Sequence, residues 1–186
     1  MDTQKLTEIV AYILTRNDGV MDYYNLIKEC YIADRMSVAR TGYAMTGDSY
    51  VSMNRGPVLK NLYSFIKNKY TDADRQHLWN QIFSTSDHKI KLLKNDVPHS
   101  KLSRCDTNIL NEVCQRFYKY SYAQMRDYSH SEGVFPEWQP VERGEEKPIP
   151  METIMKALNF SDEDIHILIN EHLSYEQEKS ALCSLN

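Results

Sequence analysis

The 186-residue sequence contains few cysteines, and these do not form the pairs that mark a metal or redox site. Zinc sites need Cys or His clustered at ligand spacing, and no CxxC pair is present, so we expect no metal site. The four cysteines are Cys30, Cys105, Cys114 and Cys183. We interpret them as reduced, mostly buried thiols of a cytoplasmic protein.

Targeting and membrane segments are also missing from the sequence pattern. The first ten residues, MDTQKLTEIV, lack the basic start and the apolar stretch of a signal peptide. No apolar run approaches the roughly 18 residues that a membrane-spanning helix needs. We therefore expect a cytoplasmic protein without membrane insertion.

The chain also lacks the excess of basic residues that is typical of nucleic-acid binders. Its formal net charge is −4 and its pI is about 5.9. Lysines and arginines are interspersed with acidic residues, apart from a local basic patch at Lys89, Lys91, Lys94 and Lys101. Because nucleic-acid binders usually show a basic face or stripe, we expect no nucleic-acid partner.

The motifs of common catalytic and cofactor sites are absent. No glycine-rich phosphate loop of the GxxxxGK or GxGxxG type occurs, and no GxSxG nucleophile elbow is present. The acidic run Asp162, Glu163 and Asp164 lacks the alternating ligands and central glycine of a calcium loop, and it fits the first turn of a helix. The sequence therefore predicts no bound cofactor and no metal.

What the sequence does contain is apolar residues along its whole length, at 41% of the chain, and 13 tyrosines. Such a composition indicates one folded domain, either alone or extended by an appendage. Tyrosines are enriched at protein interfaces, but they also occur as half-buried rings of a small core. Both interpretations of the tyrosines stay open.

Helical spacing of apolar residues dominates the pattern. It predicts helices over residues 3–16 and about 22–40, a short one over 74–83 that carries Trp79, and a long one from about 103 to 119. Ser121 is expected to cap a further short helix. The alternation over Phe83 to Leu93 predicts a small hairpin that turns at Ser86-Asp87.

A second hairpin is expected in the stretch MTGDSYVSMNRGPVLKNLY. We predict strands at 43–45 and 49–53 around the turn Thr46-Gly47-Asp48. Gly56-Pro57 then starts a helix, because proline is tolerated in a first helical turn. The predicted fold class is therefore mainly α (α+β): a compact helical domain with one or two small β-hairpins and a C-terminal helical pair.

The predicted organisation has three parts: a helical domain over 1–140, an exposed connector over 141–150, and C-terminal helices over 151–186. The connector, VERGEEKPIP, is charged and carries prolines. Beyond it, Met151 to Leu158 form a short helix, and Ser161 caps a final helix. These helices are expected to pack on the domain or on a partner.

Two polar residues stand out as candidates for chemistry. Asp34 lies on the apolar stripe of the second helix, and a buried carboxylate must be paired or hydrogen-bonded, so it is either a structural anchor or a catalytic acid. His130 follows a helix and precedes a Pro-Trp loop, where a cap or buried hydrogen-bonding role competes with catalysis. The residues favour a protein without catalysis. An enzyme site around Asp34, Arg55 and His130 is the alternative.

The order of the motifs resembles the Panacea domain, the SocA-like antitoxin and phage-associated protein family. The matching residues of the first block are Tyr31, Ala33, Asp34, Gly42, Met45, Thr46, Gly47, Asp48, Gly56, Pro57 and Val58. Those of the second block are Ser129, His130, Pro136 and Trp138. The resemblance spans roughly residues 5 to 140.

The resemblance implies an antitoxin that neutralises a partner toxin, or a host or defence protein, by direct binding. It also implies similarity to proteolytic adaptors that deliver a toxin to a ClpXP-type protease. No catalytic residue follows from it. A transcriptional autoregulator of a toxin–antitoxin operon is a further alternative, and the oligomeric state and the bacterial or phage origin stay open.

Within this interpretation the candidate residues fall into two sets. The expected partner-binding residues are Tyr43, Tyr50, Arg55, His130 and Trp138, with Tyr50 and Arg55 presented outward. The expected structural signature consists of Asp34, Gly47, Asp48, Gly56 and Pro57.

Overall fold

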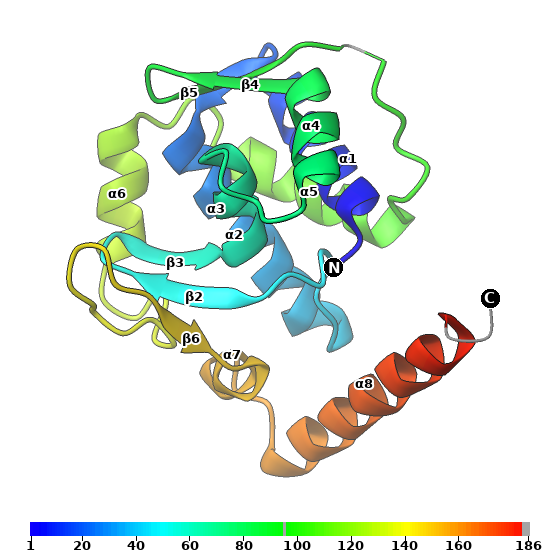
Figure 1. The fold of residues 1–186 in the computed structure, drawn as a ribbon. Coiled ribbons are helices and arrows are strands. Elements are labelled where there is room, and N and C mark those ends of the chain that lie inside the picture. The colour runs from blue at the N-terminus through cyan, green and yellow to red at the C-terminus, as the bar shows by residue number, and fades with distance from the viewer. Residues whose placement is uncertain (95, 184–186) are drawn as a thin grey trace.

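The computed structural model describes residues 1–94 and 96–183, and it is mainly α with two small antiparallel sheets (Figure 1). Its helices are α1 Thr3–Arg16, α2 Tyr23–Thr41, α3 Lys60–Ile66, α4 Ala73–Ile82, α5 Arg104–Arg116, α6 Tyr122–His130, α7 Met151–Ala157 and α8 Asp162–Cys183. Its strands are β1 Val20–Asp22, β2 Tyr50–Met53, β3 Gly56–Leu59, β4 Phe83–Ser86, β5 Lys89–Leu92 and β6 Lys147–Ile149. The predicted fold class is confirmed. Across the described residues, no helix combines the length and apolarity needed to cross a membrane.

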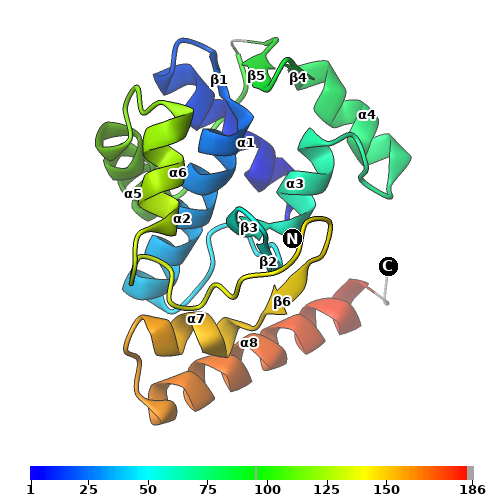
Figure 2. The same ribbon diagram turned by 90° about the vertical axis from the view of Figure 1, so that its left-hand side faces the viewer.

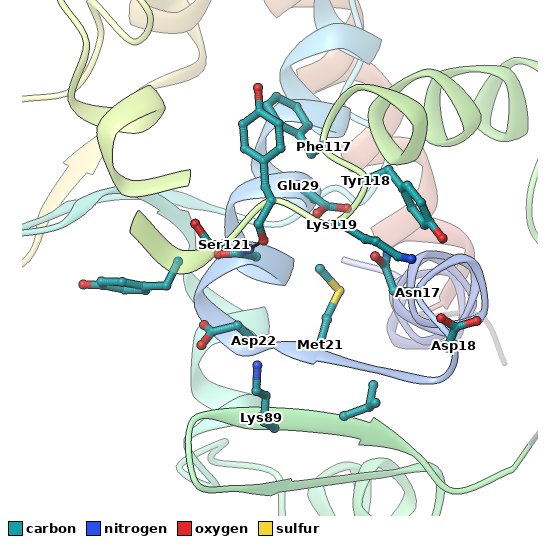
Figure 3. Close-up of a pocket in the computed structure, with 14 residues that line it drawn as sticks. Asn17, Asp18, Met21, Asp22, Glu29, Lys89, Phe117, Tyr118, Lys119 and Ser121 are labelled. Carbon is teal, nitrogen blue, oxygen red and sulfur yellow. Dashed lines mark hydrogen bonds between the residues drawn. The ribbon is translucent and has the colours of Figure 1, made fainter. Parts of the chain in front are cut away.

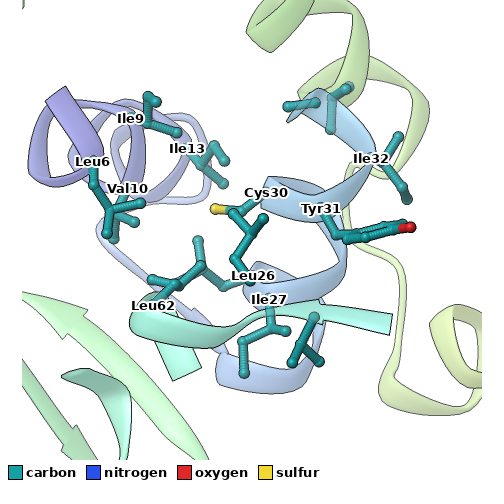
Figure 4. Packing of buried hydrophobic residues seen from close by; sticks show 14 of the residues in the cluster. Leu6, Ile9, Val10, Ile13, Leu26, Ile27, Cys30, Tyr31, Ile32 and Leu62 are labelled. Atoms are coloured by element: carbon teal, nitrogen blue, oxygen red, sulfur yellow. The ribbon is translucent and has the colours of Figure 1, made fainter. Parts of the chain in front are cut away.

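Helix α2 runs through the centre of the molecule, and the other elements pack around it. Asp22 caps its first turn by accepting a hydrogen bond from the Tyr24 amide, and Gly42 ends it in a left-handed conformation with φ of 78°. The helix contacts α1, α3, α5, α6, α7 and β3, so residues on all its sides are buried. Figure 4 shows Leu26 and Cys30 directed towards the α1 side, where Ile13 lies, while Tyr31 and Ile32 lie on the other side.

The predicted hairpin around Thr46-Gly47-Asp48 is wrong. Strand β2 instead pairs with β3, which follows it directly after a turn at Asn54-Arg55, with Met53 opposite Gly56. Pro57 therefore lies in a strand and does not start the helix. It is tolerated there because β3 is an edge strand of the sheet β3-β2-β6.

Helix α3 begins at Lys60, three residues later than Pro57, because a different residue supplies its cap. The Asp48 carboxylate accepts hydrogen bonds from the backbone amides of Asn61 and Leu62, at 3.1 and 3.0 Å. These amides have no partner within their own helix, so a carboxylate stabilises the helix start. The turn residue Asp48 thus acts on a helix that lies beyond the hairpin.

The segment expected as an exposed connector contains a strand. Lys147–Ile149 pair with the free edge of β2, and Ile149, opposite Tyr50, is buried. The expectation of an exposed connector is therefore wrong for Ile149, whereas Lys147 and Pro148 are exposed although they lie in the strand. Residues 142–146 before the strand are exposed.

The second sheet has the order β1-β5-β4 and lies at the other end of the molecule (Figure 1). The predicted hairpin over 83–93 is confirmed, with its turn at Asp87-His88, one residue later than expected. Both turn residues have positive φ, at 48° and 63°, as a two-residue turn between twisted strands requires. Strand β1, which pairs with β5, was not predicted.

The remaining helices agree with the sequence pattern. Ser103 caps α5 in a capping box with Asp106, and Ser121 caps α6 in the same way; α5 ends at Arg116, three residues earlier than predicted. The two C-terminal helices are confirmed, and Figure 2 shows α7 and α8 side by side below the domain. Helix α7 contacts α2 and α8, and Leu168 of α8 packs against Gly42.

Candidate functional site

The Asp34 carboxylate ties the centre of α2 to the loop that precedes β2. It is fully buried and accepts three hydrogen bonds: from the Thr46 amide at 2.8 Å, the Thr46 hydroxyl at 2.7 Å and the Tyr50 hydroxyl at 2.8 Å. Burial raises the pKa of Asp34, and the hydrogen bonds from Thr46 and Tyr50 oppose this rise. Every donor comes from the Met45–Tyr50 stretch, so the carboxylate fixes that stretch to the helix.

The other signature residues stand around the same hairpin. Asp48 is 6% exposed and caps α3, while its own amide donates to the Thr46 hydroxyl. Gly56 has φ of +100°, and a Cβ on it would lie 2.7 Å from Nζ of Lys28. The Pro57 carbonyl accepts a hydrogen bond from that same amine at 2.7 Å. Gly47 also has positive φ, at 62°, and is exposed.

Tyr50 does not face outward, contrary to expectation. It is 5% exposed, and its hydroxyl is engaged by Asp34. Burial of its ring and the neighbouring Asp34 raise the pKa of Tyr50. The reason is that the side chain lies on the face of the sheet that packs against α2, where its ring meets the Tyr31 ring edge-on with centroids 5.9 Å apart.

Three of the other candidates lie near one another around the β2–β3 turn. Arg55 sits exposed in the turn itself. The Trp138 indole is half-buried and donates from Nε1 to the Met53 carbonyl at 2.9 Å. The exposed His130 ring lies 5.4 Å from the Trp138 ring, centroid to centroid. Tyr43 is also exposed, at 41%, but it lies beside α8 and donates to Glu171 at 2.8 Å.

The loop that carries Trp138 is held against α2 by a buried ion pair. Glu137 is 2% exposed and accepts from the Tyr31 hydroxyl at 2.7 Å and from Nε of Arg35 at 2.8 Å. The Phe135 ring packs edge-on against Tyr31, with centroids 5.3 Å apart. The second sequence block is therefore joined to the first through α2.

The model of one protein family, described as antitoxin SocA-like, Panacea domain, matches residues 26–139. The chain belongs to this family. The resemblance predicted from the motifs is thereby confirmed. Comparison with curated proteins and with solved structures gave no match. Family membership supports an antitoxin-type role, favours a non-enzymatic function and implies a protein partner such as a toxin.

The match covers the part of the Panacea domain that the buried carboxylates organise. Asp34, Asp48 and Glu137 all lie inside it, whereas α1 and the elements from β6 onward lie outside. Each of these carboxylates accepts at least two hydrogen bonds from within the domain. These three carboxylates therefore help to hold the domain together.

The grouping of Asp34, Arg55 and His130 required by an enzyme site is not found. Among the described residues, the hydrogen-bond partners of the Asp34 carboxylate are Thr46 and Tyr50. His130 instead contacts Trp138, and Arg55 is in the turn. Across the part of the chain that the structure describes, no group of three or more His, Cys, Asp or Glu side chains lies close enough together to hold a metal ion.

The cysteines are divided between core and surface. Cys30 and Cys114 are buried free thiols, and Cys105 is exposed, so the expectation of mostly buried thiols holds for the first two. Burial raises the pKa of the Cys114 thiol to about 12. The side chain of Cys183 lies outside the described residues.

A cavity of about 620 Å³ opens beside the β2–β3 turn of the Panacea domain. Its lining includes the cations Lys28, Arg55, Lys67 and Arg143 and the rings of Tyr23, Tyr24 and Tyr63. Its only acidic lining residue among those described is Glu145. The cavity is therefore basic and aromatic.

The base of this cavity holds a residue that the sequence pattern did not single out. Lys28 is 1% exposed, and burial lowers the pKa of its amine to about 7. Its Nζ lies 5.3 Å from the centroid of the Tyr24 ring. Lys28 lies outside the apolar stripe that marked Asp34, so no local pattern indicated its burial.

Proposed function

We propose that this Panacea-domain protein is an antitoxin that neutralises a partner toxin by binding it directly. The observation that carries the proposal is that the polar side chains of the matched region fall into two groups, one buried and one on the surface. The polar groups of Asp34, Asp48 and Glu137 are used in internal contacts, while Arg55, His130 and Trp138 gather on the surface around one turn. These three carboxylates thus hold together a scaffold that presents this surface.

We define the turn face as Arg55, His130, Trp138 and the basic cavity over Lys28. It combines features of protein interfaces: an arginine, half-buried aromatic rings and a concave site. Interface energy is concentrated in a few such residues, so Trp138 and Arg55 are the proposed anchors. The cavity supplies positive charge, which suits an acidic side chain of the partner. Tyr43 forms a separate candidate contact beside α8.

The proposal is tested by co-expressing the chain with each protein encoded by a neighbouring gene and measuring growth arrest, growth rescue and complex affinity. Arg55→Ala and Trp138→Ala are each expected to weaken the complex at least tenfold, as hot-spot residues do. Arg104→Ala, at an exposed arginine of α5, is the matched control and is expected to leave affinity unchanged. Circular dichroism of each variant reports whether the fold is retained.

Two outcomes oppose the proposal. If no toxin is bound or neutralised and only small metabolites accompany the purified protein, direct protein binding is refuted. If the complex forms but the Arg55 and Trp138 variants bind like the Arg104 variant, the turn face is refuted. Measuring the toxin's half-life with and without a ClpXP-type protease then separates neutralisation by binding from delivery for degradation.

A further inference from the structure

Helix α2 carries two buried hydrogen-bond acceptors that the described residues leave without a donor. They are Oδ1 of Asn25 and Oε2 of Glu29, on side chains that are 4% and 1% exposed. The orientation of the amide is fixed, because Nδ2 of Asn25 donates to the Tyr120 carbonyl at 2.6 Å. A buried acceptor without a partner lowers stability, and a buried carboxylate does so more strongly. Burial accordingly raises the pKa of Glu29 to about 8.

The residues that carry these acceptors, Asn25 and Glu29, both line one cavity, which has a volume of about 380 Å³. It lies between the turn from α1 to β1, helix α2 and the segment that joins α5 to α6. Figure 3 shows Lys119, Asn17 and Met21 on the same side of the Glu29 carboxylate, with Lys119 the nearest of the three in this view. The cavity is distinct from the basic cavity of the turn face, and none of the sequence motifs pointed to it.

The chemistry of the unpartnered atoms identifies the class of ligand. Oδ1 of Asn25 is an acceptor, and an ionised Glu29 offers a second acceptor beside it, so a ligand that donates hydrogen bonds and carries positive charge would pair with both. Asn25 and Glu29 are four residues apart on one helix face, which places their side chains next to each other. A guanidinium group presents several N–H donors in one plane and can reach two neighbouring acceptors, whereas an ammonium is a compact point charge.

The walls of the cavity favour the same group. Four aromatic residues are among the lining residues: Phe117, Tyr118, Tyr120 and Tyr122. Of these, Tyr118 and Tyr122 are exposed, and a planar guanidinium stacks well on exposed aromatic rings. The charged lining consists of the acids Asp18, Asp22 and Glu29 against the cations Lys89 and Lys119, so an ionised Glu29 leaves an excess of one negative charge.

The cavity mouth resembles a protein-binding surface. Three exposed apolar or aromatic side chains line this cavity: Val20 at 45%, Tyr118 at 52% and Tyr122 at 36% exposure. Exposed apolar and aromatic residues gathered at one place are typical of contact sites for other proteins. This favours a guanidinium carried by a protein over a free small molecule.

We propose that the Asn25–Glu29 cavity binds a guanidinium group, and that in the toxin complex of the proposed function this group is an arginine side chain of the toxin. The second half of this statement rests on the proposed function, and the first half does not. The ligand then supplies the hydrogen-bond donors that both acceptors lack. This explains why polar residues occupy helix positions where apolar residues would be more stabilising.

The first experiment uses the free full-length protein and methylguanidinium as the probe, followed by NMR. We expect saturable shifts of the amides of residues 17–22 and 117–122. Urea, which is planar and donates but carries no charge, is expected to bind at least tenfold more weakly. Glu29→Gln is expected to weaken methylguanidinium binding at least tenfold, and Glu112→Gln, at an exposed carboxylate of α5, is the matched control that leaves it unchanged.

A second variant keeps the test decisive if Glu29→Gln fails to fold. Lys119→Glu changes an exposed lining residue and makes the cavity more negative, so we expect methylguanidinium to bind several-fold more tightly. The proposal is overturned if the wild type shows no saturable shifts, if urea binds as well as methylguanidinium, or if the Glu29 and Lys119 variants bind like the wild type.

The complex with the toxin then identifies the source of the group. If it is an arginine of the toxin, Glu29→Gln weakens the complex at least tenfold and excess methylguanidinium competes with the toxin. If free methylguanidinium binds but neither effect is seen in an otherwise intact complex, the toxin arginine is refuted. If no toxin is neutralised at all, the proposed function fails, while the titration of the free protein still decides on the cavity.

Discussion

Replacing Lys28 by methionine tests how the centre of the domain is built. The amine is buried, donates to the Pro57 carbonyl at 2.7 Å, and has no carboxylate within 4 Å among the described residues. Burial lowers its pKa from 10.5 to about 7. Methionine has a similar length and no charge, so Lys28→Met removes the titrating group and keeps most of the packing.

The sign of the effect follows from proton binding. Between pH 7 and pH 10.5 the unfolded chain holds a proton on Lys28 that the folded protein releases, so the unfolding free energy of the wild type rises with pH. Lowering the pKa from 10.5 to about 7 costs about 5 kcal/mol of stability below pH 6, at about 1.36 kcal/mol per pKa unit. By pH 9 the remaining cost is about 2 kcal/mol.

The substitution also has a cost that does not depend on pH. The Pro57 carbonyl loses its donor, which is worth about 1–2 kcal/mol. We therefore expect Lys28→Met to be more stable than the wild type by about 3 kcal/mol at pH 6, and to lose most of this advantage by pH 9. The narrowing of the difference, about 2–3 kcal/mol, is the diagnostic quantity.

The measurement is urea unfolding of both proteins at pH 6, 7, 8 and 9 at constant ionic strength. Other groups that titrate, such as Glu29 and Cys114, are shared by both proteins and cancel in the difference. Lys69→Met, at an exposed lysine, is the matched control and is expected to show no pH-dependent difference. A Lys28→Met difference that stays constant from pH 6 to pH 9 would refute the argument, because the amine would then titrate alike in both states.

The remaining predictions concern Tyr50, Gly56 and Glu137 and are checked by urea unfolding at pH 7. Tyr50→Phe removes one of the three donors to the buried Asp34 carboxylate and is expected to destabilise by about 2 kcal/mol; no change would mean that this bond adds nothing. Gly56→Ala should destabilise by more than about 2 kcal/mol, since its φ is +100° and its Cβ would lie 2.7 Å from a buried amine. Gly133→Ala, also at positive φ but with nothing within 4 Å, is its control, expected at about 1 kcal/mol. Glu137→Gln should destabilise by about 2–3 kcal/mol, because it leaves a guanidinium without its carboxylate; an unchanged midpoint would contradict this.

The helices could be predicted because their signals are local. Apolar spacing marks α1 and α5, and capping residues such as Ser103 and Ser121 mark where helices begin. The strands could not be predicted equally well. Strands β1 and β6 have three residues each and exist through pairing with β5 and β2, which no local pattern records. Gly56-Pro57 is compatible with a helix start and with an edge strand, and the cap from Asp48 decides between them.

The candidate site was predictable only where one residue broke a pattern. Asp34 stood out as a polar residue on an apolar stripe, and its burial bears out the need for partners that it implied. Lys28 and Glu29 lie outside that stripe, so no local pattern marked them. Helix α2 is buried on all sides, so polar residues on its other faces are equally confined.

Lys28 and Glu29 are neighbours of opposite charge, yet they do not neutralise each other. Successive residues of a helix point about 100° apart, and here the lysine reaches β3 while the glutamate lines the cavity beside α5. Burial shifts both pKa values towards the uncharged forms, so each residue reduces stability at neutral pH. Apolar residues would serve the fold better at both positions. Both residues have a reason to be there if helix α2 places one ionisable group in each of two cavities. A bound partner then restores the folding stability that burial of these two groups costs the free protein.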